Sequence, residues 1–125
     1  MDADRLLRIA LIAVGLIFTV GIYPLSIVWP SGWAWGHGHS HYLMMIIGIY
    51  ATLGVFLLLA SRDPQAHGSI IWFTVWSSVV HGAIMAVQSF ADPMETGHLI
   101  ADVPALFIVA AVLGVLMLRT KRTEF

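Results

Sequence analysis

Length, composition and charge restrict this chain to a small membrane domain. It has 125 residues, of which 59% are hydrophobic and only 10% are charged, so it is too apolar for a soluble domain and too short for two domains. A formal net charge of −1 provides no basic surface for a nucleic acid, and the absence of cysteine excludes thiolate metal sites, Fe–S clusters and disulfide exchange. We therefore expect a single membrane domain over residues 1–125, with the lipid bilayer and not nucleic acid as its partner.

Four long apolar runs have the length that crosses a bilayer, which is about 20 residues for a helix. They cover residues 6–28, 41–60, 69–90 and 99–118. The predicted fold is an all-α membrane protein whose four transmembrane helices form an up-down bundle. Pro24 predicts a kink near the outer end of the first span, because proline removes a helical hydrogen bond. In the fourth span, Pro104 indicates that the regular helix begins near this residue.

The basic residues predict the orientation of the four spans. All six Lys and Arg residues lie in the N-terminal segment, in the loop between the second and third spans or in the C-terminal tail; they are Arg5, Arg8, Arg62, Arg119, Lys121 and Arg122. Cytoplasmic loops carry such an excess of basic residues. We therefore expect both termini to be cytoplasmic and the loops around Trp33 and Met94 to face outward.

Histidines alternate in the outer loop before the second span. His37, His39 and His41 are separated by Gly38 and Ser40, so an extended segment would project the three imidazoles to one side. Neutral imidazoles in this arrangement are good ligands for Zn or Cu. The alternative is that they are solvated residues next to the head-group layer.

The second outer loop places carboxylates near a histidine. Glu95, His98 and Asp102 are spaced i, i+3 and i+7, which puts them on one face of a helix. A carboxylate in that position could share a metal ion with the imidazole or orient the ring by hydrogen bonding. The alternative for Asp102 is a cap at the N-terminus of the fourth helix, just before Pro104.

His81 lies deep in the third span. It precedes Phe90 by nine positions, so roughly 13 Å of helix separates it from the outer boundary, near the middle of a core about 30 Å thick. Met85 and Gln88 share its helical stripe, and ionisable groups at this depth normally face a bundle interior or a pore. We interpret His81, Met85 and Gln88 as candidate cofactor-binding or proton-relay residues. The alternative is a neutral imidazole that shares hydrogen bonds with Ser77 and a neighbouring helix.

Several short segments are similar to a known group of membrane proteins. They are Tyr23-Pro24-Leu25, Trp29-Pro30-Ser31-Gly32-Trp33, Gly48-Ile49-Tyr50-Ala51-Thr52-Leu53-Gly54, Trp76-Ser77-Ser78-Val79-Val80-His81 and Gly97-His98. Together they resemble small four-span bacterial inner-membrane proteins grouped as a family of unknown function. The resemblance covers most of the chain and implies a multi-pass protein of the bacterial inner (plasma) membrane. It implies no activity, cofactor or catalytic residue.

These patterns lead to one principal hypothesis about function. An outward-facing His/Asp/Glu site binds a transition-metal ion, Zn or Cu, or a metal cofactor. His41 and His98 are the primary ligands, Asp102 is a further ligand or orients the ring, and His37 and His39 help the ion to enter. A bis-histidine haem is a further possibility, but it has no supporting motif. Whether the protein catalyses a reaction is left open by the sequence.

Two other classes of function compete with the metal hypothesis. In the first, the chain is a small oligomeric proton-linked transporter or channel, with His81 and Gln88 lining a polar path. In the second, it is an accessory subunit whose small-residue faces pack against a larger membrane complex. Metal content, proton conduction in liposomes and co-purification with a large partner separate the three classes.

Overall fold

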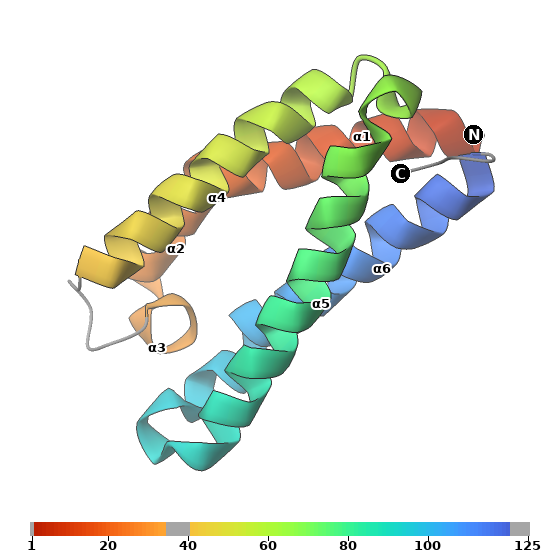
Figure 1. Cartoon of the computed structure of the whole chain (residues 1–125). Coiled ribbons are helices and arrows are strands. Elements are labelled where there is room, and N and C mark those ends of the chain that lie inside the picture. Colours follow the sequence, from red (N-terminus) through yellow and green to blue (C-terminus); the bar gives the residue numbers. More distant parts are fainter. Residues whose placement is uncertain (1, 35–40, 121–125) are drawn as a thin grey trace.

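The computed structural model describes residues 2–34 and 41–120, which fold into helices (Figure 1). The elements are α1 Ala3–Leu16, the π-helical segment η1 Ile17–Gly21, α2 Ile22–Val28, α3 Pro30–Trp33, α4 His41–Ala60, the 3₁₀ segment η2 Pro64–His67, α5 Gly68–Ala91, the 3₁₀ segment η3 Pro93–Ile100, and α6 Asp102–Thr120. Together they form 4 helical stretches long and apolar enough to cross a membrane: Ala3–Val28, His41–Ala60, Pro64–Ala91 and Pro93–Thr120. The predicted all-α fold with four membrane spans is confirmed, and the chain is a multi-pass membrane protein.

The first span is continuous but contains a π-helical turn. The backbone N–H of Ile22 bonds to the carbonyl of Ile17, five residues earlier. Pro24 explains this turn, because its ring clashes with the carbonyl four residues before it and it offers no N–H. Widening the preceding turn accommodates the ring. The effect of Pro24 is therefore found upstream of the proline, as η1, and the helix continues through α2.

The helices pack as two pairs, α1 with α4 and α5 with α6. The pairs meet at the end that carries the N-terminus, the α4–α5 turn and the end of α6, and they diverge toward the opposite end (Figure 1). Small residues bring α1 and α4 close together: a Cβ on Gly54 would lie 2.7 Å from the carbonyl oxygen of Gly15. Close backbone approach of this kind is typical of membrane helices. The hydrophobic effect does not drive helices together in lipid, so their association depends on close van der Waals packing.

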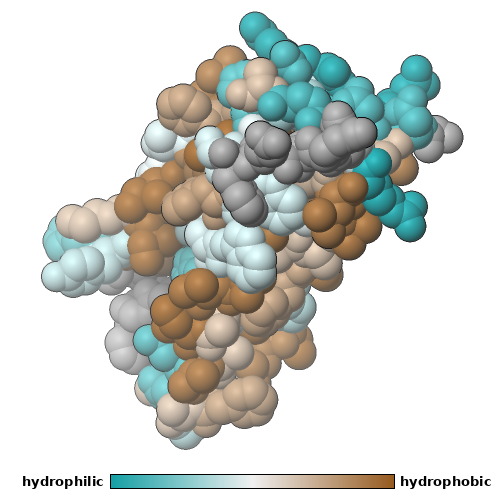
Figure 2. Space-filling view, turned by 45° about the vertical axis from the view of Figure 1, so that its right-hand side comes forward, coloured by the Kyte–Doolittle hydropathy of each residue, from teal (hydrophilic) through white to brown (hydrophobic). Residues whose placement is uncertain are grey.

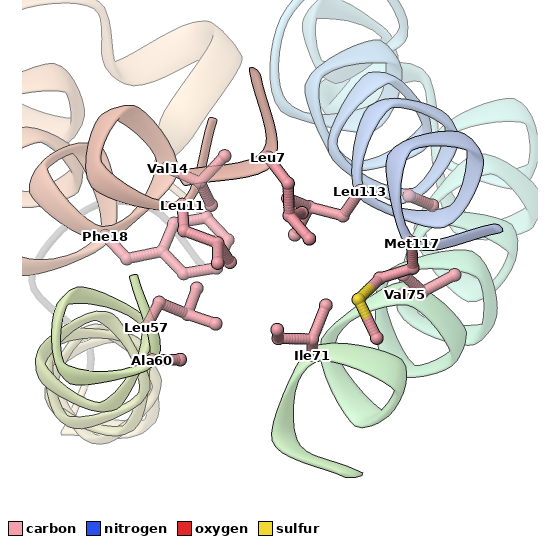
Figure 3. Packing of buried hydrophobic residues seen from close by; sticks show 11 residues of the cluster. Leu7, Leu11, Val14, Phe18, Leu57, Ala60, Ile71, Val75, Leu113 and Met117 are labelled. Carbon is pink, nitrogen blue, oxygen red and sulfur yellow. The ribbon is translucent and has the colours of Figure 1, made fainter. Parts of the chain in front are cut away.

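The buried core lies where the two pairs meet. It is formed by apolar side chains from all four spans (Figure 3), namely Leu7, Leu11, Val14, Phe18, Leu57, Ala60, Ile71, Val75, Ala110, Leu113 and Met117. At the same end, the guanidinium of Arg8 donates hydrogen bonds to the carbonyls of Ser61 and Arg62 and so joins α1 to the α4–α5 turn. The largest group of hydrophilic residues lies at one end of the molecule, smaller hydrophilic groups lie elsewhere, and apolar side chains cover much of the remaining face in view (Figure 2).

A compact cap of α3 and η3 connects the diverging ends of the two helix pairs. Neither element was predicted. A Cβ on Gly97 would lie 2.5 Å from the carbonyl oxygen of Ser31, and a Cβ on Gly32 would lie 2.5 Å from the Cβ of Ala101. The two backbones therefore touch. The α-helical part of the fourth span begins at Asp102, two residues before the predicted start at Pro104, which lies in the first turn of α6.

Candidate functional site

His98 is held inside the cap between two carboxylates. Its side chain is 1% exposed, and Nδ1 lies 2.9 Å from both Oδ1 and Oδ2 of Asp102. On the opposite edge of the ring, Nε2 lies 3.2 Å from the carbonyl oxygen of Ala34 and 3.1 Å from Oε2 of Glu95. The 3₁₀ turns of η3 followed by the first turn of α6 bring these side chains together. The two ring nitrogens thus have hydrogen-bond partners in Asp102 and in the carbonyl of Ala34, whereas Oε2 of Glu95 is buried and makes no hydrogen bond with the described residues.

Glu95, His98 and Asp102 are neighbours in the structure, and the two carboxylates lie beside different nitrogens of the His98 ring. The two carboxylates face opposite edges of one ring and do not converge on a common point. A metal ligand must direct a free nitrogen lone pair at the ion. Within residues 2–34 and 41–120, no group of three or more His, Cys, Asp or Glu side chains could hold a metal ion.

The predicted metal site also included three histidines in and after the loop between the first two spans. His41 is the first residue of α4, where its side chain is exposed. His37 and His39 lie outside the described residues. Of the predicted metal ligands, Glu95, His98 and Asp102 are in contact with one another. The metal-binding roles of all six residues, which include His37, His39 and His41, stay predictions.

A second polar pair lies in the middle of the membrane-spanning region. The hydroxyl of Tyr50 on α4 and Nδ1 of His81 on α5 share a hydrogen bond. Their rings are also stacked, with centroids 5.6 Å apart and an interplanar angle of 28°. Phe18 contacts the other side of Tyr50 edge-to-face, with centroids 5.0 Å apart. The polar partner of His81 is thus Tyr50 and not Ser77, whose hydroxyl donates to the carbonyl of Thr74.

A large cavity lies between the two helix pairs, and we call it the wedge cavity. It has a volume of about 760 Å³ and is lined by residues from all four spans. Most of its wall is apolar, including Ile17, Leu25, Ile47, Leu106 and Val109. Its polar lining comes from Trp33, Tyr50, His81, Gln88 and Asp102. Asp102 therefore belongs to two environments, because its carboxylate holds His98 inside the cap and the residue also lines the cavity.

The wedge cavity is lined by the candidate site residues of the third span. His81, Met85 and Gln88 all line it, as the stripe on that span led us to expect of residues facing the bundle interior. Two further lining residues were missed as site residues, Tyr50 and Trp33. A signal for Tyr50 exists in the sequence: it lies nine residues after His41 at the outer end of its span, and His81 lies nine residues before Phe90. In antiparallel spans this spacing puts both side chains at one depth.

Trp33, the last residue of α3, has an unusual environment. Its indole Nε1 is buried and has no hydrogen-bond partner among the described residues. Buried N–H groups are normally paired, so such a donor requires an explanation. Trp33 lines the wedge cavity, as does Asp102.

Comparison with known proteins gives a family but no activity. Residues 2–123 match the model of a family described as a family of unknown function, DUF6632. The match covers nearly the whole chain, so the protein belongs to this family. No curated protein and no solved structure matches the chain.

Proposed function

We propose that this protein binds a lipophilic molecule inside the bilayer, in the wedge cavity. The observation that carries the proposal is the cavity itself, whose volume of about 760 Å³ lies between diverging helix pairs. Sites for small molecules and cofactors are typically roughly 300–1,000 Å³, mostly apolar, with a few placed polar groups. The wedge cavity has the same character, with Tyr50 and His81 as a hydrogen-bonded pair in its wall.

The surroundings of the cavity favour entry from the lipid phase. Lining residues such as Ile17, Ile46, Ile84 and Ile108 are exposed on the membrane-spanning surface. At the outer end, α3 packs against η3, where Gly97 and Ser31 are in backbone contact. At the other end the apolar core fills the space between the pairs. These features support lateral entry of a ligand that is dissolved in the bilayer.

The metal hypothesis is retained as a second proposal, because Glu95, His98 and Asp102 are in contact at the outer end. For Zn or Cu to bind there, the His98 ring would have to release one of its carboxylate partners. We also propose that the protein resides in the bacterial inner membrane with both termini in the cytoplasm, as the basic residues indicate. A homo-oligomer or a larger complex, with proton-linked transport through the cavity, is compatible with ligand binding.

The test is to fill the cavity without disturbing the helices. Gly21 lines the cavity, and a Cβ there would meet nothing closer than its own neighbour Ile17 at 3.5 Å. Gly48 on α4 is the matched control, because a Cβ there meets nothing within 4 Å and the residue does not line the cavity. Both residues are changed to leucine, and native mass spectrometry from lipid nanodiscs measures molecules retained by each protein.

We expect the wild-type protein and Gly48→Leu to retain a lipophilic molecule and Gly21→Leu to lose it. Equal retention by all three proteins would contradict the proposal, because Gly21 lines the cavity and its replacement by leucine adds a side chain to the cavity wall. Metal analysis of the same untagged samples tests the second proposal: stoichiometric Zn or Cu that is lost in His98→Ala and in His41→Ala would support the predicted metal site.

A further inference from the structure

The contact between Tyr50 and His81 uses one of the two nitrogens of the His81 ring. Nδ1 shares the hydrogen bond with the hydroxyl of Tyr50, which is the hydrogen-bond partner of the His81 side chain in the part of the chain that the structure describes. Among the described residues, the buried side-chain nitrogen and oxygen atoms that lack a hydrogen-bond partner belong to Trp33, Ser89 and Glu95. Nε2 of His81 is not one of them, so it is not sealed inside the protein. Because His81 lines the wedge cavity, Nε2 is the atom of this pair that can bind a ligand there.

The hydroxyl of Tyr50 determines which nitrogen of His81 carries the proton. A phenol has one O–H to donate, and Nδ1 of His81 is the acceptor that the described residues offer it. If Nδ1 carried the proton, it would donate to the phenol oxygen, and the Tyr50 O–H would need a second acceptor. A neutral imidazole has a single N–H, so acceptance at Nδ1 assigns the proton to Nε2. His81 therefore offers a hydrogen-bond donor, Nε2–H, to a molecule in the cavity.

This donor lies at a depth that restricts the chemistry of the ligand. His81 precedes Phe90, near the end of α5, by nine residues. About 13 Å of helix therefore separates it from that end, which places it near the middle of a hydrocarbon core about 30 Å thick. A charged or zwitterionic head group is costly to bury at this depth without a charged partner. A ligand that bonds to His81 therefore does so through a neutral polar group.

We propose that the ligand of the wedge cavity is a neutral lipophile with a carbonyl group, whose oxygen accepts a hydrogen bond from Nε2–H of His81. This inference rests on the proposed function, because it names the class of molecule that the cavity binds. The apolar parts of the ligand lie against lining residues such as Ile47, Leu106 and Val109. A pure hydrocarbon would leave the N–H without a partner. A carbonyl accepts the bond without adding a donor that needs an acceptor of its own.

Three probes of one chain length test the proposal: a dialkyl ketone with its carbonyl at the middle of the chain, the matching secondary alcohol and the matching alkane. Each probe is titrated separately into phosphatidylcholine nanodiscs that contain the full chain. Native mass spectrometry measures the fraction of the protein that carries a bound probe. We expect saturable binding of the ketone, roughly threefold to tenfold tighter than that of the alkane, which is the contribution of one hydrogen bond inside a membrane protein.

The double variant Tyr50→Phe/His81→Phe removes the polar atoms of the pair and keeps two aromatic rings. Both replacements are needed, because His81→Phe alone would leave the Tyr50 O–H free to donate to the ketone. We expect the double variant to bind the ketone as weakly as the alkane, while binding of the alkane is unchanged. The matched control is Tyr42→Phe/His67→Phe, at two exposed residues that do not line the cavity. It should keep the preference for the ketone.

The outcomes distinguish this inference from the proposed function. Saturable and equal binding of all three probes to the wild-type protein would overturn the carbonyl and leave the cavity as a ligand site. Tighter binding of the alcohol, with the ketone and the alkane equal, would show that Nε2 is an acceptor and would also overturn the inference. A ketone preference that persists in Tyr50→Phe/His81→Phe would overturn the role of His81.

The molecule retained by the wild-type protein and lost in Gly21→Leu gives a second test. It is released from the protein and identified by mass spectrometry. A neutral molecule with a carbonyl supports the inference, and its structure shows whether the carbonyl belongs to an ester, a ketone or a quinone. A phospholipid or a hydrocarbon would overturn the inference and uphold the proposed function. No retained molecule and no saturable binding of any probe would overturn both.

Discussion

Tyr50 and His81 are joined by a hydrogen bond and by stacking of their rings, and this contact connects α4 to α5. Both residues line the wedge cavity. The contact therefore fixes the width of the cavity in the membrane and presents polar atoms to an otherwise apolar space. This pair gives a structural reason for a histidine at such depth in an apolar chain.

Removal of the hydroxyl should weaken the association of α4 with α5. Tyr50→Phe keeps the ring and its contact with Phe18, so only the hydrogen bond to His81 is lost. Hydrogen bonds between membrane helices contribute about 0.6–1.7 kcal/mol, and we expect a loss of this size in the free energy of unfolding in mixed micelles. Tyr42→Phe is the control, because Tyr42 is 78% exposed. An equal loss in both variants would show that the Tyr50–His81 bond has no specific role.

Loss of the His98 side chain should be more damaging. His98→Ala removes a buried ring that is hydrogen-bonded to Asp102 and to the carbonyl of Ala34, and leaving a buried polar group without such a bond costs about 1–3 kcal/mol. His67→Ala, at an exposed histidine of the α4–α5 turn, should cost less than about 1 kcal/mol. Thermal unfolding of the two variants measures the difference. Equal stability of both variants would mean that the cap does not depend on His98.

Because α1 and α4 are in close contact at Gly54, leucine substitutions at Gly54 and Gly48 should have different effects on stability. Gly54→Leu introduces a Cβ that would lie 2.7 Å from the carbonyl oxygen of Gly15, so the two helices must separate. Overpacking of this kind costs about 1–3 kcal/mol. Gly48→Leu places the same side chain on the same helix where a Cβ meets nothing within 4 Å, and it should be nearly neutral. Similar losses in both variants would show that the close contact between Gly54 and Gly15 does not control stability.

The orientation of the chain is testable with reporter fusions. The basic residues predict that the loop around Pro64 is cytoplasmic and the segment after Trp33 faces outward. Fusions of alkaline phosphatase after Gly36 and after Pro64 should therefore be active and inactive, respectively. Activity of the same kind at both positions would overturn the orientation, and with it the outward position of the His98 cap.

Much of the fold could be predicted because membrane spans are local features of hydropathy. The predicted second span, 41–60, has the bounds of α4, and the others differ by a few residues at their ends. The neighbours of His98 could also be predicted, since Glu95 and Asp102 are three and four residues away. The short elements α3 and η3 could not be predicted, because their packing depends on glycine contacts between distant segments, such as that of Gly97 with Ser31.

The wedge cavity could not be predicted from the sequence, for a different reason. A helical stripe indicates that His81, Met85 and Gln88 face the same way, but it does not tell which neighbouring helix lies opposite or how far away. The pairing of Tyr50 with His81 and the splaying of the two helix pairs are tertiary features. From the sequence, Asp102 had two candidate roles, as a metal ligand or as the group that orients the His98 ring; the carboxylate contacts that ring, and the sequence did not indicate that Asp102 also lines the cavity.

Saturable photolabelling tests the central claim, that the wedge cavity is a ligand site, most directly. A neutral diazirine-bearing hydrocarbon is photolysed in nanodiscs that contain the protein, and the labelled residues are identified by peptide mass spectrometry. We predict label on cavity residues such as Ile47, Met85 and Leu106 that decreases as unlabelled hydrocarbon is added. Label on exposed Phe73 and Val87, which do not line the cavity, should not saturate and serves as the control for lipid contact. Label confined to such lipid-facing residues, or cavity label that does not decrease with competitor, would contradict a ligand site between the helix pairs.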